Sequence, residues 1–241
     1  MSYFVKPVRW VAVTATATAS VLLATTGVAN AASGTVNTAG SPLTVRASPG
    51  TGYDAWSTVA DGHSVTILCQ TGGSTVTGTY GTSSLWDMIG NGGFVSDTYV
   101  FTGSDGAVTH GCTYSADPPR ANPSGRNAAI SYEFARLGST AEEGLCLHFQ
   151  AAAYGWSFSG WATAEIGGDW LTSHGYMHTT GIPPRGALVW YHNSSGTGHV
   201  VLSLGEGKII GSSVGGQVGV ANYLYRTGYR GWTVAYLPAA G

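Results

Sequence analysis

The feature that most constrains this chain is a change, part-way along, in the spacing of its apolar residues. From Ser33 to about Gly103, short runs rich in Val, Thr, Ile and Tyr are bounded by Gly, Pro and Asn, a pattern typical of β-strands. Beyond a proline-rich stretch at 114–124, apolar residues recur at helical spacing, which predicts amphipathic helices. We therefore expect two parts, one over 33–113 and one over 125–241, joined by a linker over 114–124.

The composition narrows the class of protein. Glycine accounts for 37 of the 241 residues and only 9% of the residues are charged, whereas an average soluble domain has about 25% charged residues. Many turns together with 8 Trp and 13 Tyr favour short packed strands over disorder. Because the formal net charge is -2, the chain lacks the basic surface that binds a phosphate backbone, and we expect no nucleic-acid partner.

The first 31 residues have the pattern of a secretory signal peptide. Lys6 and Arg9 precede an uncharged stretch over 10–23, and Ala31 completes the small-x-small motif that signal peptidase reads. Thr and Ser dilute the apolar stretch, which is shorter than the roughly 20 residues that a membrane span needs. We expect cleavage of 1–31, a protein that is extracellular or associated with the cell wall, and no membrane span in the mature chain.

Three cysteines follow that segment, Cys69, Cys112 and Cys146. Thiols outside the cell can pair, and three of them allow one internal bridge and leave one thiol over. A bridge between Cys69 and Cys112 would fasten the tail of the first part to one of its strands and contribute on the order of 4 kcal/mol by the chain-entropy model. We predict this pairing. Spacing alone does not establish connectivity, and an inter-chain bridge through Cys146 stays open.

The first part resembles a known module. Four of its strands are expected over 43–46, 64–70, 74–79 and 93–100, and five short strands that close on themselves would make a small barrel. The motif L-x-V-R-x-x-P-G-x-x-Y at 43–53 is similar to the opening signature of bacterial SH3-like domains, and Trp86 and the run at 93–100 match the later strands of that family. Such modules usually bind cell-wall peptides, which is what the resemblance implies here. A barrel that is only a scaffold stays open because a fold does not fix a function.

The second part begins with helices and ends with strands. Apolar spacing predicts one helix over 126–137 and a second that ends near Tyr154. The second helix could begin at a capping box formed by Thr140 and Glu143, or later, after Gly144. Strands are expected over 187–191, 199–204, 208–213 and 232–237. Helices followed by an antiparallel sheet make an α+β fold.

A cysteine and a histidine in this part could form a catalytic pair. Cys146 lies early in the second predicted helix, and His199 opens a predicted strand. A cysteine enzyme needs a thiolate near neutral pH, and both a helix N-terminus and a neighbouring imidazole favour the thiolate. We expect Gly198, just before the histidine, to leave room for the substrate backbone. A helix that carries the nucleophile against a sheet that carries the base is the arrangement of papain-like folds.

The motifs around this pair resemble a family of cell-wall hydrolases. P-R-G-A-L-V-W-Y at 184–191, G-H-V at 198–200 and L-G-E-G-K-I-I at 204–210 are similar to the pattern of NlpC-type and CHAP (cysteine, histidine-dependent amidohydrolase/peptidase) enzymes. In those families the cysteine that heads a helix is the nucleophile and the histidine of G-H-V is the base. The resemblance therefore assigns these roles to Cys146 and His199, and implies a peptidoglycan amidohydrolase or endopeptidase.

The third catalytic residue of the pattern is missing. Gly211 stands where NlpC-type enzymes place a polar residue that orients the imidazole, and a glycine cannot do so. Ser212 is a neighbouring substitute: if 206–207 is a two-residue turn, Ser212 lies on the same face of the sheet as His199. Asn222 is a weaker candidate. A serine orients an imidazole less strongly than a carboxylate does.

The sequence leaves a second interpretation open. Leu145 and Leu147 flank Cys146 where the families often carry polar or aromatic residues. A half-buried cysteine among apolar residues is usually only a small apolar side chain, so a non-catalytic wall-binding protein with a degenerate hydrolase fold remains an alternative.

The remaining histidines give little sign of a metal site. His174 and His178 are four positions apart, but no H-E-x-x-H motif accompanies them and Gly175 between them argues against a helix. His148, two positions past Cys146, should point away from that cysteine on a helix. We expect neither a metal nor a cofactor.

Overall fold

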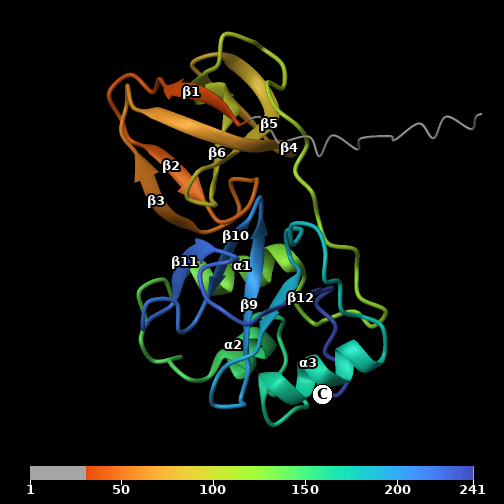
Figure 1. The fold of residues 1–241 in the computed structure, drawn as a ribbon. Coiled ribbons are helices and arrows are strands. Elements are labelled where there is room, and N and C mark those ends of the chain that lie inside the picture. The colour runs from red at the N-terminus through yellow and green to blue at the C-terminus, as the bar shows by residue number, and fades with distance from the viewer. Residues whose placement is uncertain (1–30, 241) are drawn as a thin grey trace, which may run out of the picture.

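The computed structural model describes residues 31–240, and the predicted signal peptide over 1–31 lies outside that range except for its last residue. Two antiparallel sheets form separate parts of the molecule, the first above the second in the view of Figure 1. Within 31–240, no helix has the length and apolar character needed to cross a membrane.

The first sheet has seven strands in the spatial order β3-β2-β6-β5-β4-β1-β7. The elements are β1 (Ala32–Val36), β2 (Leu43–Arg46), β3 (Ala55–Val59), β4 (Ser64–Gly78), β5 (Gly81–Ile89), β6 (Phe94–Ser96), the 3-10 helix η1 (Asp97–Tyr99) and β7 (Val100–Phe101). Alternation along β2 buries Leu43 and Val45, so that one face of the sheet is apolar. The sheet curls around this face (Figure 1).

This sheet differs from the expected five-stranded barrel. The edge strands β3 and β7 are not paired with each other in the part of the chain that the structure describes, so the sheet is curled and not closed. The two strands expected over 64–70 and 74–79 are one strand, β4, with a shift of register between Gly72 and Val76. Local Gly and Ser residues give the appearance of a break, but pairing with β5 continues past them.

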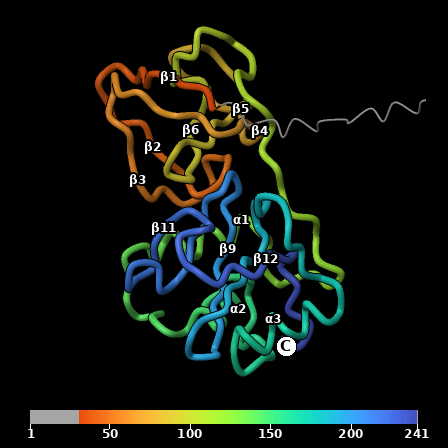
Figure 2. Tube along the Cα trace, viewed as in Figure 1, coloured from red at the N-terminus to blue at the C-terminus, as the bar shows by residue number. Residues whose placement is uncertain are grey.

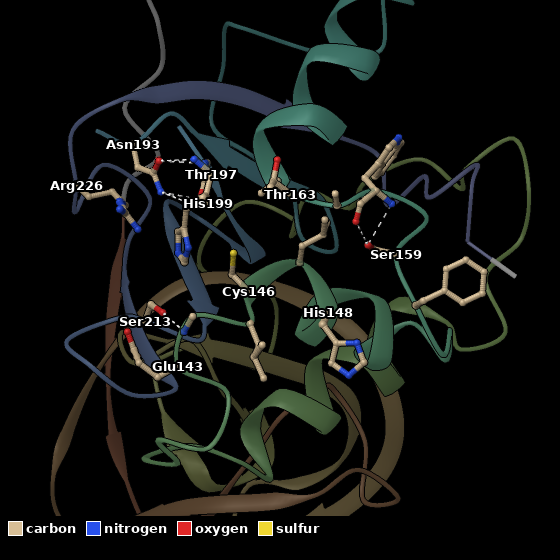
Figure 3. Close-up of a pocket in the computed structure, with 18 residues that line it drawn as sticks. Glu143, Cys146, His148, Ser159, Thr163, Asn193, Thr197, His199, Ser213 and Arg226 are labelled. Carbon is tan, nitrogen blue, oxygen red and sulfur yellow. Dashed lines mark hydrogen bonds between the residues drawn. The ribbon is translucent and has the colours of Figure 1, made fainter. Parts of the chain in front are cut away.

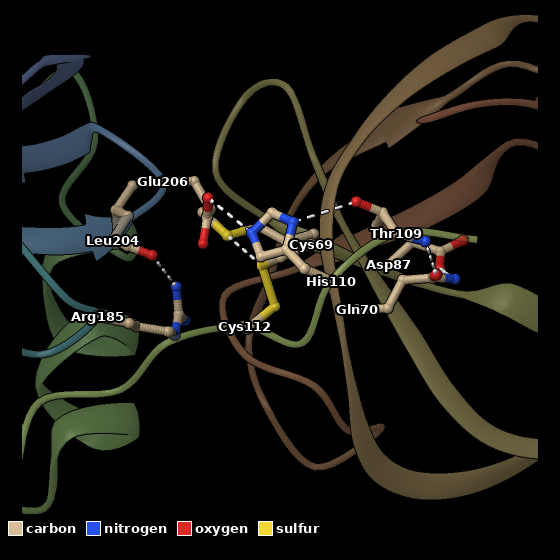
Figure 4. Close-up of a disulfide and its surroundings, with 10 residues drawn as sticks. Cys69, Gln70, Asp87, Thr109, His110, Cys112, Arg185, Leu204 and Glu206 are labelled. Atoms are coloured by element: carbon tan, nitrogen blue, oxygen red, sulfur yellow. Dashed lines mark hydrogen bonds and ion pairs between the residues drawn. A yellow bond between two sulfur atoms is a disulfide. The ribbon is translucent and has the colours of Figure 1, made fainter. Parts of the chain in front are cut away.

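The predicted disulfide is confirmed. Cys69 on β4 is bonded to Cys112, and both lie beside the second part of the molecule in Figure 4. The backbone adds to this link, because the N–H of Gln70 donates to the carbonyl of His110 and the N–H of Cys112 donates to the carbonyl of Gln70, each at 3.0 Å. The segment that follows the first sheet is therefore held against β4 on both sides of the bridge.

The second part consists of three helices followed by a five-stranded sheet in the order β11-β10-β9-β8-β12. The elements are α1 (Arg126–Phe134), α2 (Cys146–Ala153), α3 (Ala164–Ser173), β8 (Leu188–Tyr191), β9 (His199–Gly205), β10 (Lys208–Gly211), β11 (Gly219–Asn222) and β12 (Tyr229–Thr233). Residues of α1 and α2 share one apolar cluster with alternate residues of β8 and β9, so these helices cover one face of the sheet. Figure 2 shows the same arrangement along the backbone.

Several boundaries differ from those expected: α1 ends at Phe134 and not at 137, and the last strand, β12, spans Tyr229–Thr233 and not 232–237. The second helix begins after Gly144, so the later of the two predicted starts is correct. Helix α3 was not predicted, because Gly167 and Gly168 lower its intrinsic helix propensity. It is stabilised at its first turn by the hydroxyl of Thr163, which accepts from the N–H of Ile166 at 3.2 Å.

One buried arginine joins the two sheets. The side chain of Arg185 is fully buried and donates to the carbonyl of Leu204 on β9 at 3.1 Å. The same guanidinium donates to the carbonyl of Ala47 and, at 3.1 Å, to the hydroxyl of Ser48, both next to the first sheet, and it lies over the ring of Phe94 on β6. A buried cation therefore satisfies backbone carbonyls from both parts.

Apolar contacts continue across the same boundary. Trp56 of β3 stacks on Phe134 of α1 with ring centroids 4.4 Å apart, and one hydrophobic cluster contains residues of both sheets. At the edge, the imidazole of His110 lies 3.2 Å from the carboxylate of Glu206. The two parts are packed together by a shared core as well as by polar contacts.

The segment over 114–124, predicted to be a linker, has no helix or strand but is held in place. The backbone of Arg185 bonds to the residues on either side of Tyr114. The N–H of Arg185 donates to the carbonyl of Thr113, and the carbonyl of Arg185 accepts from the N–H of Ser115 at 2.8 Å. The segment then runs down the side of the second part (Figure 1).

Candidate active site

Cys146 is the first residue of α2, and its position follows from the turn before it. Gly144 has a positive φ of 76°, which ends the preceding turn and lets the helix begin two residues later. No side chain caps the helix at Leu145. The N–H groups of Cys146, Leu147 and, on β9, Val200 each act to lower the pKa of the Cys146 thiol. The sulfur therefore lies near the backbone of the residue directly after His199.

The loop that precedes His199 is held by hydrogen bonds with the side chain of Asn193. The side-chain oxygen of Asn193 accepts from the N–H groups of Thr197 and Gly198, each at 3.0 Å, and its nitrogen donates to the carbonyl of Gly198 at 2.9 Å. These bonds fix the loop immediately before β9. His199 is only 3% exposed, so its ring has little freedom of its own.

The cysteine and the histidine line the same cavity, which has a volume of about 600 Å³. In Figure 3 the sulfur of Cys146 lies at the start of α2 on the side of the His199 ring. The walls come from the start of α3, the Asn193 loop and a few residues from other loops, including Ser213 and Arg226. Two residues that are far apart in the sequence thus meet at one opening.

Both groups of this pair are neutral in the structure. Burial raises the pKa of the Cys146 thiol, against the opposing effect of the N–H groups around the sulfur. Burial also lowers the pKa of His199 to about 3, and the positive charge of Arg226 lowers it further. The resting site therefore holds a thiol beside an uncharged imidazole, in contrast to the thiolate that the helix start led us to expect.

The imidazole is oriented by a residue that the sequence did not indicate. Nε2 of His199 is 2.9 Å from the hydroxyl of Tyr225, in the loop after β11. Burial raises the pKa of the Tyr225 phenol, which keeps the phenol protonated and able to hydrogen-bond. Because Nε2 is occupied by Tyr225, Nδ1 is the ring nitrogen left to face a reacting group.

Ser212 does not take this role, and the reason is a shift of register. The turn before β10 pairs Lys208 with Gly205, but the next pairs are shifted by one, so Ile210 lies opposite Leu202. Ser212 consequently falls on the face of the sheet opposite to His199. Its side chain is fully buried, and its hydroxyl has no hydrogen-bond partner within residues 31–240.

Two glycines at the site serve backbone packing. A side chain at Gly211 would lie 2.6 Å from Val201 on β9, so no polar residue fits at the family's third position here. Gly198 has a positive φ, and a Cβ there would lie 2.4 Å from the backbone nitrogen of Glu165. The close approach of α3 is therefore one reason for a glycine at this position, which also lines the cavity.

Asn222 contributes through the backbone. Its side-chain oxygen accepts from the N–H of Leu224 at 2.9 Å, and its carbonyl accepts from the N–H of Tyr225 at the same distance. The turn that presents the Tyr225 hydroxyl is built on this residue. Asn222 itself makes no contact with His199 among the bonds of the described residues.

The other histidines are engaged elsewhere. His174 stacks on Trp170 with ring centroids 3.8 Å apart, and His178 stacks on Trp232 at 4.1 Å. His148 is exposed at the rim of the cavity and its ring points away from Cys146 (Figure 3). Over the described range 31–240, no group of three or more His, Cys, Asp or Glu side chains could hold a metal ion.

Comparison with known proteins gives limited matches. No protein-family model matches the chain. The uncharacterized proteins YraJ and YraI of Bacillus subtilis (strain 168) are 47% identical over 72 residues and 43% identical over 74 residues. Each match covers 27% of this chain, and the chain spans 61% and 62% of the length of these relatives.

Solved structures with some similarity include NlpC2 and NlpC1 from Trichomonas vaginalis, each 16% identical in sequence. The alignments cover 86% and 85% of this chain and 73% and 70% of theirs, with TM-scores of 0.34 and 0.33. TM-scores at this level do not establish a common fold. The functional argument therefore depends on the site itself.

Proposed function

We propose that the protein is a secreted amidohydrolase or endopeptidase that cleaves amide bonds of peptidoglycan, with Cys146 as nucleophile and His199 as base. One observation carries the proposal: Cys146, at the start of α2, and His199, at the start of β9, line one cavity. The resemblance of the motifs at 184–191 and 198–200 to NlpC-type and CHAP enzymes supports the choice of substrate.

The chemistry starts from the neutral pair. Nδ1 of His199 takes the proton of the Cys146 thiol as the sulfur attacks the amide carbonyl, and a tetrahedral oxyanion forms. Backbone N–H groups at the start of α2 stabilise that oxyanion. The imidazolium then gives its proton to the leaving amine, and a thioester remains. Water, deprotonated by the same imidazole, hydrolyses the thioester to a carboxylic acid and restores the thiol.

Tyr225 fits this sequence as a positioning residue. For Nδ1 of His199 to accept a proton, Nε2 must carry one and donate it to the hydroxyl oxygen of Tyr225. A neutral phenol accepts this bond without fixing a charge next to the imidazole. The arrangement orients the ring and leaves the base only weakly activated.

The first sheet is proposed to be the SH3-like, wall-binding part of the same protein, acting outside the cell. The motif at 43–53 and the disulfide between Cys69 and Cys112 support this role and location, because stable disulfides are typical of oxidising compartments. Peptidoglycan would then be the partner of both parts.

The assignment is tested by incubating purified bacterial cell walls with the mature protein and measuring soluble peptide fragments. Cys146→Ala should reduce release by at least about 1,000-fold, because the nucleophile is removed. His148→Ala removes an imidazole from the rim of the same cavity and should leave release unchanged. Equal release by the parent protein and Cys146→Ala would refute the proposal.

A second candidate function is wall binding without catalysis. The raised pKa of Cys146 and the lowered pKa of His199 favour it, because neither group is activated in the structure. In this case walls should bind the parent protein and Cys146→Ala equally well in a pull-down, and neither should release fragments.

A further inference from the structure

Arg226 differs from every other arginine in residues 31–240. Each of the others donates to a carbonyl or carboxylate oxygen: Arg46, Arg120, Arg126, Arg136, Arg185 and Arg230. Among the described residues Arg226 has no carboxylate within 4.0 Å and no bond to a carbonyl; its hydrogen-bond partner is the hydroxyl of Tyr225. A guanidinium has five N–H donors, so most of those of Arg226 are unused.

This unused group belongs to the cavity of the candidate active site. Arg226 lines that cavity together with Cys146 and His199, and Figure 3 shows its guanidinium extending toward the His199 ring. The rings of Tyr191 and Tyr225 each lie 5.9 Å from the guanidinium carbon, on which they exert a cation–π attraction. The two tyrosines hold the cation in place without neutralising it.

Nothing in the cavity wall balances this charge directly. Glu143 is the acidic residue of the cavity lining; its side chain is exposed and forms no ion pair with Arg226. A planar guanidinium with free N–H groups matches a carboxylate, which can accept two parallel hydrogen bonds from it. Within the described part of the chain, Arg226 is therefore an unpaired cation in the cavity wall, with N–H groups free to bind an anionic ligand.

We propose that Arg226 binds a carboxylate of the substrate, so that the cleft selects peptides with a free carboxylate close to the amide that Cys146 attacks. The proposal rests on the proposed function, because it names the substrate of the same site. A stem peptide that contains lysine offers carboxylates of two kinds, the free α-carboxylate of a γ-linked D-glutamate and the carboxylate at the C-terminus.

The bound carboxylate also acts on the base. The charge of Arg226 is one of the two causes that hold the pKa of His199 low. A substrate carboxylate paired with Arg226 offsets that charge, and the imidazole becomes a better proton acceptor when substrate is present. The carboxylate should therefore affect kcat as well as KM.

The test uses synthetic stem pentapeptides, L-Ala-γ-D-Glu-L-Lys-D-Ala-D-Ala, in four forms. The α-carboxyl of D-Glu is free or amidated, and the C-terminal carboxyl is free or amidated, so that the two sources are separated. Amidation of the carboxyl that Arg226 binds should lower kcat/KM by about 10- to 100-fold, the loss expected for a charged hydrogen bond. Amidation of the other carboxyl should have little effect.

Variants show whether Arg226 is responsible. Arg226→Gln should remove the preference for the free carboxyl, whereas Arg226→Lys should keep part of it because the charge remains. Lys208→Gln removes a positive charge outside the cavity and should keep the whole preference. If Arg226→Gln lowers cleavage of all four peptides by the same factor, the residue is only structural and the proposal is wrong.

A binding measurement separates this proposal from the proposed function. The Cys146→Ala variant is titrated calorimetrically with the same four peptides, with and without Arg226→Gln. Tighter binding of one free-carboxyl form, lost with Arg226→Gln, supports the carboxylate site even if the parent protein cuts none of the peptides. Equal affinity for all four peptides overturns it. If no peptide is cleaved but this binding preference is seen, the proposed hydrolase function is wrong and the carboxylate site is retained.

Discussion

The two parts of the molecule use cysteine in opposite ways. In the first part, Cys69 is fully buried in the sheet and bonded to Cys112, so its sulfur stabilises the fold and is not available to react. In the second part, Cys146 is the free cysteine of the described residues and lies half-buried at the edge of a cavity. The difference shows that a thiol is kept available by its place at a helix start that faces an opening.

The largest effect on this comparison is expected from removing the disulfide. Replacing Cys69 and Cys112 with Ala should lower the free energy of unfolding by on the order of 4 kcal/mol, because the unfolded chain gains the freedom of a long loop. Urea denaturation measures the change. Cys146→Ala, the matched control, should unfold at nearly the parent urea concentration, and equal losses for both would erase the distinction between the two kinds of cysteine.

The second largest effect is a loss of stability with rising pH that originates in the first part. Burial raises the pKa of Asp87 in β5 to about 7, against the hydrogen bond that Gln70 donates at 2.7 Å. Because the folded state holds this proton more tightly than the unfolded state, its contribution is complete below pH 4 and is lost as the pH rises through 7. The folded state should thus become less stable over this range, by roughly 2 to 4 kcal/mol.

Asp87→Asn tests this, since an amide keeps an acceptor for Gln70 and carries no charge. The unfolding free energy of the variant, measured by thermal melts between pH 4 and 8, should fall less than that of the parent protein. Some slope will remain because burial also raises the pKa of Asp97, to about 6. Asp54→Asn, at an exposed position, should leave the slope as it is. An unchanged slope in Asp87→Asn would contradict the assignment.

The smallest effect is expected at the positioning tyrosine of the second part. Tyr225→Phe removes the hydroxyl next to Nε2 of His199, and kcat for wall or peptide cleavage should fall about 10-fold with little change in KM. The acid limb of the kcat/KM profile should move to lower pH, because the imidazolium loses a hydrogen-bond acceptor.

Tyr229→Phe is the matched control, since the hydroxyl of Tyr229 is buried with no hydrogen-bond partner among residues 31–240. This variant should keep both kcat and the pH profile. A loss of the same size in both variants would mean that Tyr225 acts on packing alone.

The sequence predicted features that depend on a single helix or strand. Gly144 marked one of the two expected starts of α2, and the pairing of Cys69 with Cys112 was the one expected from their places at and after the strands. The sequence was uninformative where the result depends on how elements pair. A one-residue shift between β9 and β10 turns Ser212 away from His199, and local spacing carries no sign of it.

Tyr225 was missed for a related reason. It follows the edge strand β11, which the sequence pattern did not predict, and reaches His199 only because β11 is paired with β10. Its one local signal is Asn222, a residue that favours turns. The buried Arg185 was missed as well, because a charged residue is rarely fully buried and the carbonyls that it satisfies are distant in sequence.

The core that runs from Trp56 to Phe134, and the guanidinium of Arg185 beside it, make the molecule a single body. If the first sheet binds the wall and Cys146 cleaves it, as proposed, the reach of the site is fixed. The cavity at Cys146 would stay at one distance and one angle from the surface that the first sheet binds. Bonds outside that distance would be cleaved only after the protein dissociates and binds again.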